Sequence, residues 1–180
     1  MKELFENYYK RLTKYYQEKF NSKPTICYLK EYDKKLVISE EDEDGYVEWQ
    51  PVYLTQKVDF TKLEQKIGFE ICKDLKDFYS TCLLGELSGK LDKQELMFSC
   101  ITNRKKIISS VEQYYKDGQW LFPDSQIFLI GDAVVDGNDN WFICFDNLKK
   151  ALFIYNNEEE QQKKIKLPSI TSIISKLDLL

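Results

Sequence analysis

Apolar side chains recur at helical intervals over residues 3–20. The repeating set is rich in tyrosine and consists of Phe5, Tyr8, Tyr9, Leu12, Tyr15, Tyr16 and Phe20. Intervals of three and four residues place these side chains on one face of an amphipathic helix. The helix should end near Asn21, because Lys23 precedes a proline and that position disfavours helical backbone. We therefore predict an N-terminal helix whose aromatic face packs on the core.

Two shorter helices are predicted in the middle of the chain. The first should begin after Asp59, whose side chain can cap it, and end at Gly68. The second should begin at Asp74, again as a cap, and end near Gly85. Their apolar faces are Phe60, Leu63 and Ile67 in the first helix, and Leu75, Phe78, Tyr79 and Cys82 in the second.

Two more helices are predicted in the C-terminal half. One should be capped by Asn103 and closed by Asp117-Gly118, and the other should follow Pro168-Ser169. Their apolar faces are Ile107, Ile108, Val111, Tyr114 and Tyr115 in the first, and Ile170, Ile173, Ile174 and Leu177 in the second. The last set recurs at helical spacing without interruption, so the terminal helix should dock on the core.

Runs of apolar residues between these helices predict β-strands. They lie at residues 36–38, 96–101, 126–130, 141–145 and 151–155, with a further short strand near residues 165–167. Residues 136–140 have turn chemistry and join two of the strands into a hairpin, and a charged turn is expected at residues 158–160. A meander of strands results.

The order of elements predicts an α+β fold. We expect a mostly antiparallel sheet, built as a β-meander, with packed helices and a helix at each end of the chain. No repeat, Gly/Ser linker or shift in composition divides the sequence. Residues 1–180 are therefore expected to form a single domain.

The absence of histidine changes the functional picture most. It excludes Ser-His-Asp and Cys-His catalysis and His-containing zinc sites. Carboxylates can replace histidine in enzymes, so one enzymatic alternative remains, in which Asp136 and Asp139 act as a pair. The same segment does not match a calcium-binding EF-hand loop, because the twelfth position counted from Asp136 is Asn147 rather than Glu. We expect a non-enzymatic protein without a cofactor or metal.

Net charge and cysteine content limit the partner and the compartment. The net charge of −4 argues against a nucleic-acid partner, and the short run Arg104-Lys105-Lys106 is interpreted as a solvated helix start. No segment has the apolar length of a membrane span, and the N-terminus lacks the apolar core of a signal peptide. The five cysteines are an odd number, which favours reduced thiols and a cytoplasmic protein.

Acidic residues form the candidate binding surface. They are the run Glu40, Glu41, Asp42, Glu43 and Asp44, then Glu48, and the group Asp132, Asp136, Asp139 and Asp146. Clustered carboxylates attract a basic partner, although each alone is also explained as a turn or solvated residue. Trp49 lies next to the acidic run and is a candidate aromatic anchor, with a position at the edge of the core as the alternative.

Several segments follow one another in a characteristic order along the chain. They are the acidic run; Val47-Glu48-Trp49-Gln50-Pro51; Leu63-Glu64; Leu75-Lys76-Asp77-Phe78-Tyr79-Ser80-Thr81 before Gly85; Phe128-Leu129-Ile130; Trp141-Phe142-Ile143-Cys144-Phe145-Asp146-Asn147-Leu148; and the C-terminal helix before Leu179-Leu180. Taken in this order, they resemble the Syd family of SecY-interacting proteins within the SUKH superfamily. The resemblance spans nearly the whole chain. One departure is Ile71-Cys72-Lys73, where many SUKH sequences carry a proline before the short second helix.

The resemblance implies a non-catalytic α+β domain that binds protein. Syd-like proteins associate with cytosolic loops of the SecY channel through an acidic concave face, and such loops carry excess Lys and Arg. Other SUKH relatives are similar to immunity proteins that neutralise toxins. We therefore expect a partner with a basic surface, SecY first and a toxin domain as the alternative. Contact with a membrane would be indirect, through SecY, and a monomer is favoured.

Overall fold

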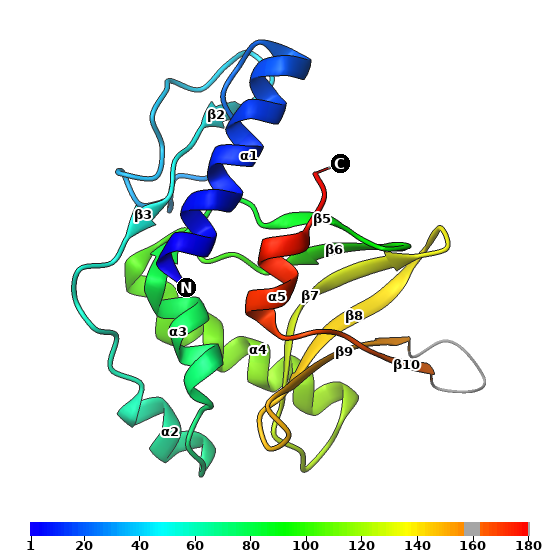
Figure 1. The fold of residues 1–180 in the computed structure, drawn as a ribbon. Helices are drawn as coiled ribbons and strands as arrows, with labels where there is room; N and C mark the ends of the chain where they lie inside the picture. The colour runs from blue at the N-terminus through cyan, green and yellow to red at the C-terminus, as the bar shows by residue number, and fades with distance from the viewer. Residues whose placement is uncertain (157–162, 180) are drawn as a thin grey trace.

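A six-stranded antiparallel sheet forms the centre of the structure (Figure 1). The computed structural model describes residues 1–156 and 163–179. Strands that are neighbours in the sheet are also successive in the chain, in the order β10-β9-β8-β7-β6-β5. The strands are β5 (Ser88–Leu91), β6 (Gln94–Phe98), β7 (Ile127–Val135), β8 (Asn138–Asp146), β9 (Ala151–Asn156) and β10 (Lys163–Lys166). The predicted α+β fold with a β-meander is confirmed.

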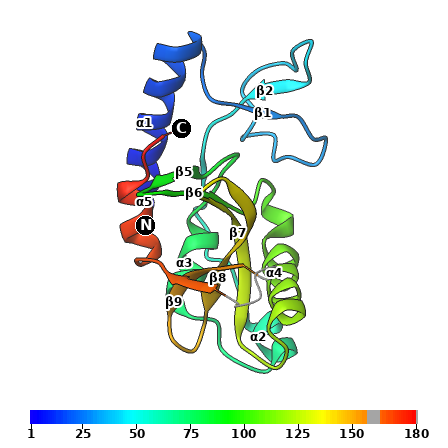
Figure 2. The ribbon, with the colours of Figure 1, turned by 90° about the vertical axis from the view of Figure 1, so that its right-hand side faces the viewer.

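Two small two-stranded sheets complete the β structure. Strand β1 (Thr25–Cys27) pairs with β2 (Tyr46–Glu48), and β3 (Val52–Tyr53) pairs with β4 (Cys82–Leu83). Figure 2 shows β1 and β2 in a lobe that projects from the body on the side away from α1 (Lys2–Phe20). This lobe forms one wall of the hollow described below.

Helices lie around the main sheet and include one near each end of the chain. Besides α1 they are α2 (Thr61–Ile67), α3 (Lys73–Thr81), α4 (Ile107–Leu121) and α5 (Ile170–Lys176), with a 3-10 turn, η1 (Arg104–Lys106), before α4. Helices α1 and α5 lie side by side in both views (Figures 1 and 2). The guanidinium of Arg11 on α1 donates to the carbonyls of Leu177 at 2.6 Å and Ile174 at 2.9 Å. These bonds satisfy carbonyls at the C-terminal end of α5, which the helix itself cannot pair.

The predicted faces of both terminal helices point into the core, apart from Phe20 at the end of α1, which is 62% exposed. On α1, Phe5 and Tyr8 are fully buried, and the helix ends at Asn21 in left-handed conformation, as expected. On α5, Ile173 and Ile174 are fully buried. The apolar periodicity therefore identified these packing faces correctly.

The cap predictions were partly right. The carboxylate of Asp59 accepts from the backbone N–H of Thr61 at 3.0 Å, and the side chain of Asn103 accepts from Lys105 N–H at 2.9 Å. Asn103 therefore caps the start of its helix as predicted, whereas Asp59 lies one residue before Phe60, the N-cap of α2. The prediction for Asp74 was wrong, because α3 begins one residue earlier and Asp74 lies inside its first turn.

Two helices end at other positions than predicted. Helix α3 ends at Thr81 rather than near Gly85, because Cys82 leaves the helix to pair with Tyr53 in a strand. Helix α4 continues past Gly118 to Leu121. In both cases tertiary contacts outweigh the local stop signals.

Two strand predictions and one loop prediction needed correction. The proposed strand at residues 36–38 is a single β-bridge between Val37 and Trp49. The strand predicted at residues 96–101 begins earlier and ends at Phe98, and its partner β5 was not predicted. The loop between β7 and β8 is shorter than expected: only Asp136 and Gly137 form the turn, with φ angles of 50° and 82°. The charged turn at residues 158–160 lies outside the described residues.

Candidate functional site

The acidic loop at residues 40–44 is an exposed turn organised by one of its own carboxylates. Asp42 accepts hydrogen bonds from the backbone N–H groups of Tyr46 at 2.7 Å and Asp44 at 3.1 Å. Gly45 follows with φ of 82°, which favours glycine. The five carboxylates, all on exposed residues, are Glu40, Glu41, Asp42, Glu43 and Asp44. Asp42 therefore shapes the loop, and the other four are available to a partner.

The two residues predicted just after this loop have structural roles. Glu48 is half-buried and forms an ion pair with Lys23 at 3.7 Å. Trp49 is fully buried, and its ring packs against that of Tyr9 in a tilted arrangement, with centroids 5.2 Å apart. The expectation that Trp49 is a surface anchor is therefore wrong. Its position in the core follows from its size and from the bridge that holds its backbone to Val37.

The four predicted aspartates of the β7–β8 hairpin do not form one group. Asp136 and Asp139 are exposed near the tip, and Asp132 is exposed in the middle of β7. Partial shielding from solvent raises the pKa of Asp132. Asp146 lies at the opposite end of β8, is largely buried, and forms an ion pair with Lys149 at 3.2 Å. Only the first three are free to face a partner.

The acidic loop and the hairpin tip do not meet. Figure 1 shows the loop region before β2 and the tip between β7 and β8 on opposite sides of the molecule. A single continuous surface built from both sets of carboxylates is therefore not present. Each set contributes charge to its own side.

A hollow of about 420 Å³ lies between the β1–β2 lobe and the sheet. Its lining includes Leu29, Glu31, Tyr32, Glu86, Met97 and Thr102. Leu29 is 48% exposed and Met97 is 44% exposed, although both side chains are apolar. Met97 on β6 is the direct cross-strand partner of Asp132 on β7. The hollow therefore continues onto the sheet beside one of the predicted acidic residues.

Two carboxylates give this hollow its charge. Glu31 pairs with Lys106, whereas Glu86 accepts a hydrogen bond from the Ser88 hydroxyl. Across the described ranges, no lysine or arginine lies within ion-pair distance of Glu86. Burial raises the pKa of Tyr16, and the charge of Glu86 adds to that shift. Sequence reasoning missed Leu29, Glu31, Glu86 and Met97, because isolated residues carry no local signal of a shared site.

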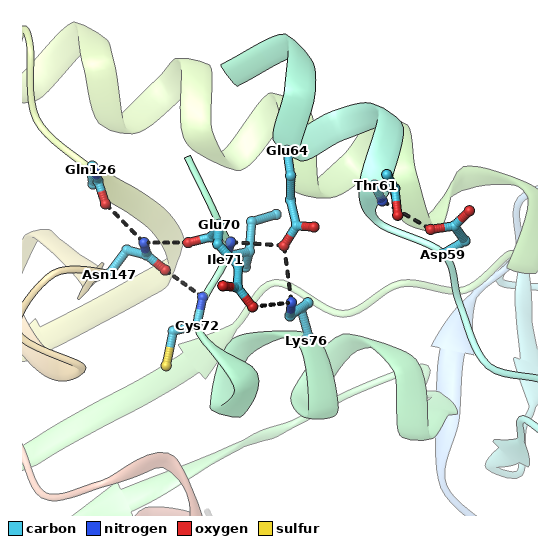
Figure 3. Close-up of polar contacts among 9 residues, drawn as sticks. All are labelled: Asp59, Thr61, Glu64, Glu70, Ile71, Cys72, Lys76, Gln126 and Asn147. Atoms are coloured by element: carbon cyan, nitrogen blue, oxygen red, sulfur yellow. Dashed lines mark hydrogen bonds and ion pairs between the residues drawn. The ribbon is translucent and has the colours of Figure 1, made fainter. Parts of the chain in front are cut away.

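A second cavity, of about 550 Å³, lies between α2 and α3 and has a mixed charge. The Glu64 carboxylate accepts from Ile71 N–H at 2.9 Å and from the Lys76 ammonium at 3.0 Å (Figure 3). Lys76 also contacts Glu70 at 3.3 Å. The charges of Glu64 and Lys76 are therefore compensated within the protein. Their contacts hold the start of α3 against α2.

Asn147 ties this helix pair to the sheet. Its side-chain oxygen accepts from Cys72 N–H at 2.6 Å, and its amide donates to the Glu70 carbonyl at 3.0 Å and to Gln126 at 2.9 Å (Figure 3). Asn147 is 6% exposed, and its side-chain bonds satisfy groups that burial would otherwise leave unpaired. The hydrogen bonds of Asn147 therefore hold the segment between α2 and α3, beside this second cavity, against the sheet.

Within the described ranges, no cluster of three or more His, Cys, Asp or Glu side chains could hold a metal ion. Burial raises the pKa of the Cys144 thiol to about 12 and the pKa values of Cys82 and Cys100 further, so these thiols are poor nucleophiles. None of the described helices is long and apolar enough to span a bilayer.

Comparison with known families gives two overlapping matches. Residues 1–107 match the family described as Syd protein (SUKH-2), and residues 55–176 match the SMI1 / KNR4 family (SUKH-1). No curated protein matches the chain. The two matches share residues 55–107, which contain α2, α3 and the β5–β6 hairpin. The Glu64–Lys76 contact and the Glu86 and Met97 side of the hollow therefore lie in the region common to both.

Proposed function

Because the chain belongs to the Syd protein (SUKH-2) family of the SUKH superfamily, we propose that it binds a basic segment of another protein, foremost the cytosolic loops of the SecY channel. Family membership supports a Syd-like or SUKH-type role in binding another protein. These families consist in general of non-enzymatic binding and immunity proteins. We propose in addition that SecY is the partner and that a particular surface of the protein binds it.

The main structural support for this proposal is the hollow between the β1–β2 lobe and the sheet. Leu29 and Met97 offer exposed apolar contact area, and Glu86 offers a carboxylate that no cation of the described chain neutralises. Interfaces gain affinity from apolar contacts in concave sites and orientation from complementary charge. A loop that carries Lys or Arg beside apolar residues would satisfy both features.

The acidic loop and the hairpin tip would act at longer range. Their exposed carboxylates contribute less than about 1 kcal/mol each to stability, so their loss should not unfold the protein. At an interface such charges mainly accelerate encounter, and salt screens them over about 8 Å at physiological ionic strength. Binding should therefore weaken as salt rises.

The experiment compares two charge reversals with a matched control. Glu86→Lys alters the hollow, and Asp136→Lys with Asp139→Lys alters the hairpin tip. Glu3→Lys, on an exposed position in the first turn of α1, makes the same change outside the lining of the hollow. Co-sedimentation with SecY-containing membranes should be strongly reduced by the first two variants and unchanged by the third. All three variants should fold and melt within about 4 °C of the wild type, since Asp136 occupies a left-handed turn position and Glu3 a helix start, both of which favour an acid slightly over lysine.

Two results would contradict the proposal. If the wild type does not bind SecY-containing membranes, SecY is the wrong partner. If it binds, and Glu86→Lys binds equally well, the hollow is the wrong surface. Loss of binding by the tip variant alone would assign recognition to the hairpin.

The immunity role is the second candidate, because the SUKH-1 match covers residues 55–176. An immunity protein would bind a basic toxin domain through the same carboxylates, with the same salt dependence. It would not bind SecY-containing membranes. A toxin gene immediately upstream, together with an inhibited toxin in a mixing assay, would decide in favour of this candidate.

A further inference from the structure

The two edges of the main sheet differ in how their backbone groups are satisfied. At β5, Ser88 N–H donates to the Tyr8 hydroxyl at 3.0 Å, and that hydroxyl donates to the Ser88 carbonyl at 3.0 Å. Lys90 N–H donates to the Asp178 carbonyl at 2.6 Å, and Asp178 N–H donates back at 2.9 Å. Ser88 and Lys90 are the residues whose groups point away from β6, so this edge is closed.

The opposite edge, β10, is open as far as the described residues show. Ile165 pairs with Ile154 on β9, and Leu167 N–H donates to the Leu152 carbonyl at 3.0 Å. Because hydrogen-bonded and non-hydrogen-bonded pairs alternate in an antiparallel ladder, the backbone groups of Lys164 and Lys166 point away from β9. In the part of the chain that the structure describes, no backbone group bonds to them. Figure 1 shows β10 at the margin of the sheet, opposite β5.

Lysine side chains dominate this open edge. Lys163, Lys164 and Lys166 are all exposed. The Lys164 ammonium lies 4.6 Å from the ring centroid of Phe122 and 5.1 Å from that of Phe153, so cation–π contacts order its side chain. Lys164 and Lys166 share one face of the sheet, and Ile165 faces the other, where it packs against the core. Lysines at an edge oppose pairing with neutral or basic strands, and above all with a second copy of the same edge.

We propose that β10 binds an extended acidic segment of a partner protein, which adds to the sheet as a further strand. Four outward backbone groups, two each on Lys164 and Lys166, supply the hydrogen bonds. The segment should place acidic side chains opposite Lys164 and Lys166, with an apolar residue between them on the face of Ile165. This site accepts the opposite charge to the hollow, so it is separate from the proposed SecY contact.

A synthetic peptide tests this directly. The probe is an acetylated and amidated peptide, Thr-Thr-Glu-Val-Glu-Thr-Thr, and the comparison peptide replaces both Glu by Lys. NMR titration should show shifts at Lys164 and Lys166, and hydrogen exchange of these two amides should slow with the acidic peptide only. An acidic peptide methylated on both Glu backbone nitrogens keeps its charge but loses the donors that face β10, so it should bind at least about tenfold more weakly.

Protein variants separate backbone pairing from charge. Lys166→Pro removes an outward N–H and should lower the association constant by about tenfold, since proline is tolerated on an edge strand. Lys164→Glu with Lys166→Glu should abolish binding, whereas Lys93→Glu in the β5–β6 turn, an exposed position on the far edge, should not affect it. Equal binding of the methylated peptide, shifts that map elsewhere than β10, or no binding by the wild type would overturn the proposal.

Discussion

Replacing Gly118 by alanine should destabilise the protein, although the local sequence suggests the opposite. Gly118 lies inside α4 and has ordinary helical backbone, without positive φ. In an exposed helix, Gly→Ala gains about 0.8–1 kcal/mol from helix propensity. Propensity alone therefore predicts a more stable protein.

The packing of α4 on β7 reverses that sign. A Cβ atom at position 118 would lie 2.0 Å from the carbonyl oxygen of Ile127 and 2.8 Å from its carbonyl carbon. Both are backbone atoms of a sheet strand, so the contact can be relieved only by moving the helix or the strand. Overpacking of this kind costs about 1–3 kcal/mol or more. Because the contact is with backbone atoms that cannot easily move, we expect this cost to exceed the gain from helix propensity. We expect Gly118→Ala to lower the free energy of unfolding by about 1–2 kcal/mol.

Urea denaturation followed by circular dichroism measures this difference. A loss of 1–2 kcal/mol in a chain of this length corresponds to a fall in melting temperature of about 2–8 °C. Gln113→Ala is the matched control, because Gln113 is exposed on the same helix and alanine there meets no strand. That variant should stay within about 0.5 kcal/mol of the wild type. A Gly118→Ala protein as stable as the wild type, or more stable, would refute the close approach of α4 to β7.

Three further predictions concern the core and the thiols. Ile173→Ala on α5 removes a fully buried side chain and should cost about 2–5 kcal/mol in urea denaturation, whereas unchanged stability would mean that this helix face is not packed. Iodoacetamide at pH 8 should label the exposed Cys27 well before Cys144, whose pKa burial raises to about 12, as mass spectrometry of digests can show. Intact mass without reductant should also show five free thiols, and two stable disulfides would contradict the reduced state.

The sequence alone was sufficient to predict the elements that are specified by residues within their own segment. In α1 and α5 the apolar residues recur every three or four positions, and the side chains they identify, such as Phe5 and Ile173, are fully buried. Helical hydrogen bonds join residues four apart, so the pattern that specifies such a helix lies within its own segment. The apolar cores of β7, β8 and β9 were identifiable for a related reason, because strands buried on both faces of a sheet are continuous apolar runs.

Elements stabilised by distant partners could not be read in the same way. Strand β5 contains few apolar side chains and exists because β6, Tyr8 and Asp178 satisfy its backbone on both sides. Residues 138–140 at the start of β8 are polar, and they remain in a strand because the backbone there pairs with the end of β7. Backbone hydrogen bonds between strands form whatever the polarity of the side chains, so no local pattern in the sequence predicts such strands.

The candidate site shows the same division. The exposed carboxylates of residues 40–44 and of Asp136 and Asp139 were visible as charge in the sequence. Their separation, the burial of Trp49, and the meeting of Leu29, Glu86 and Met97 in one hollow were decided only by the tertiary structure. A binding surface is made by residues that are neighbours in space, and the sheet brings together positions whose contact is set by packing and register rather than by spacing along the chain.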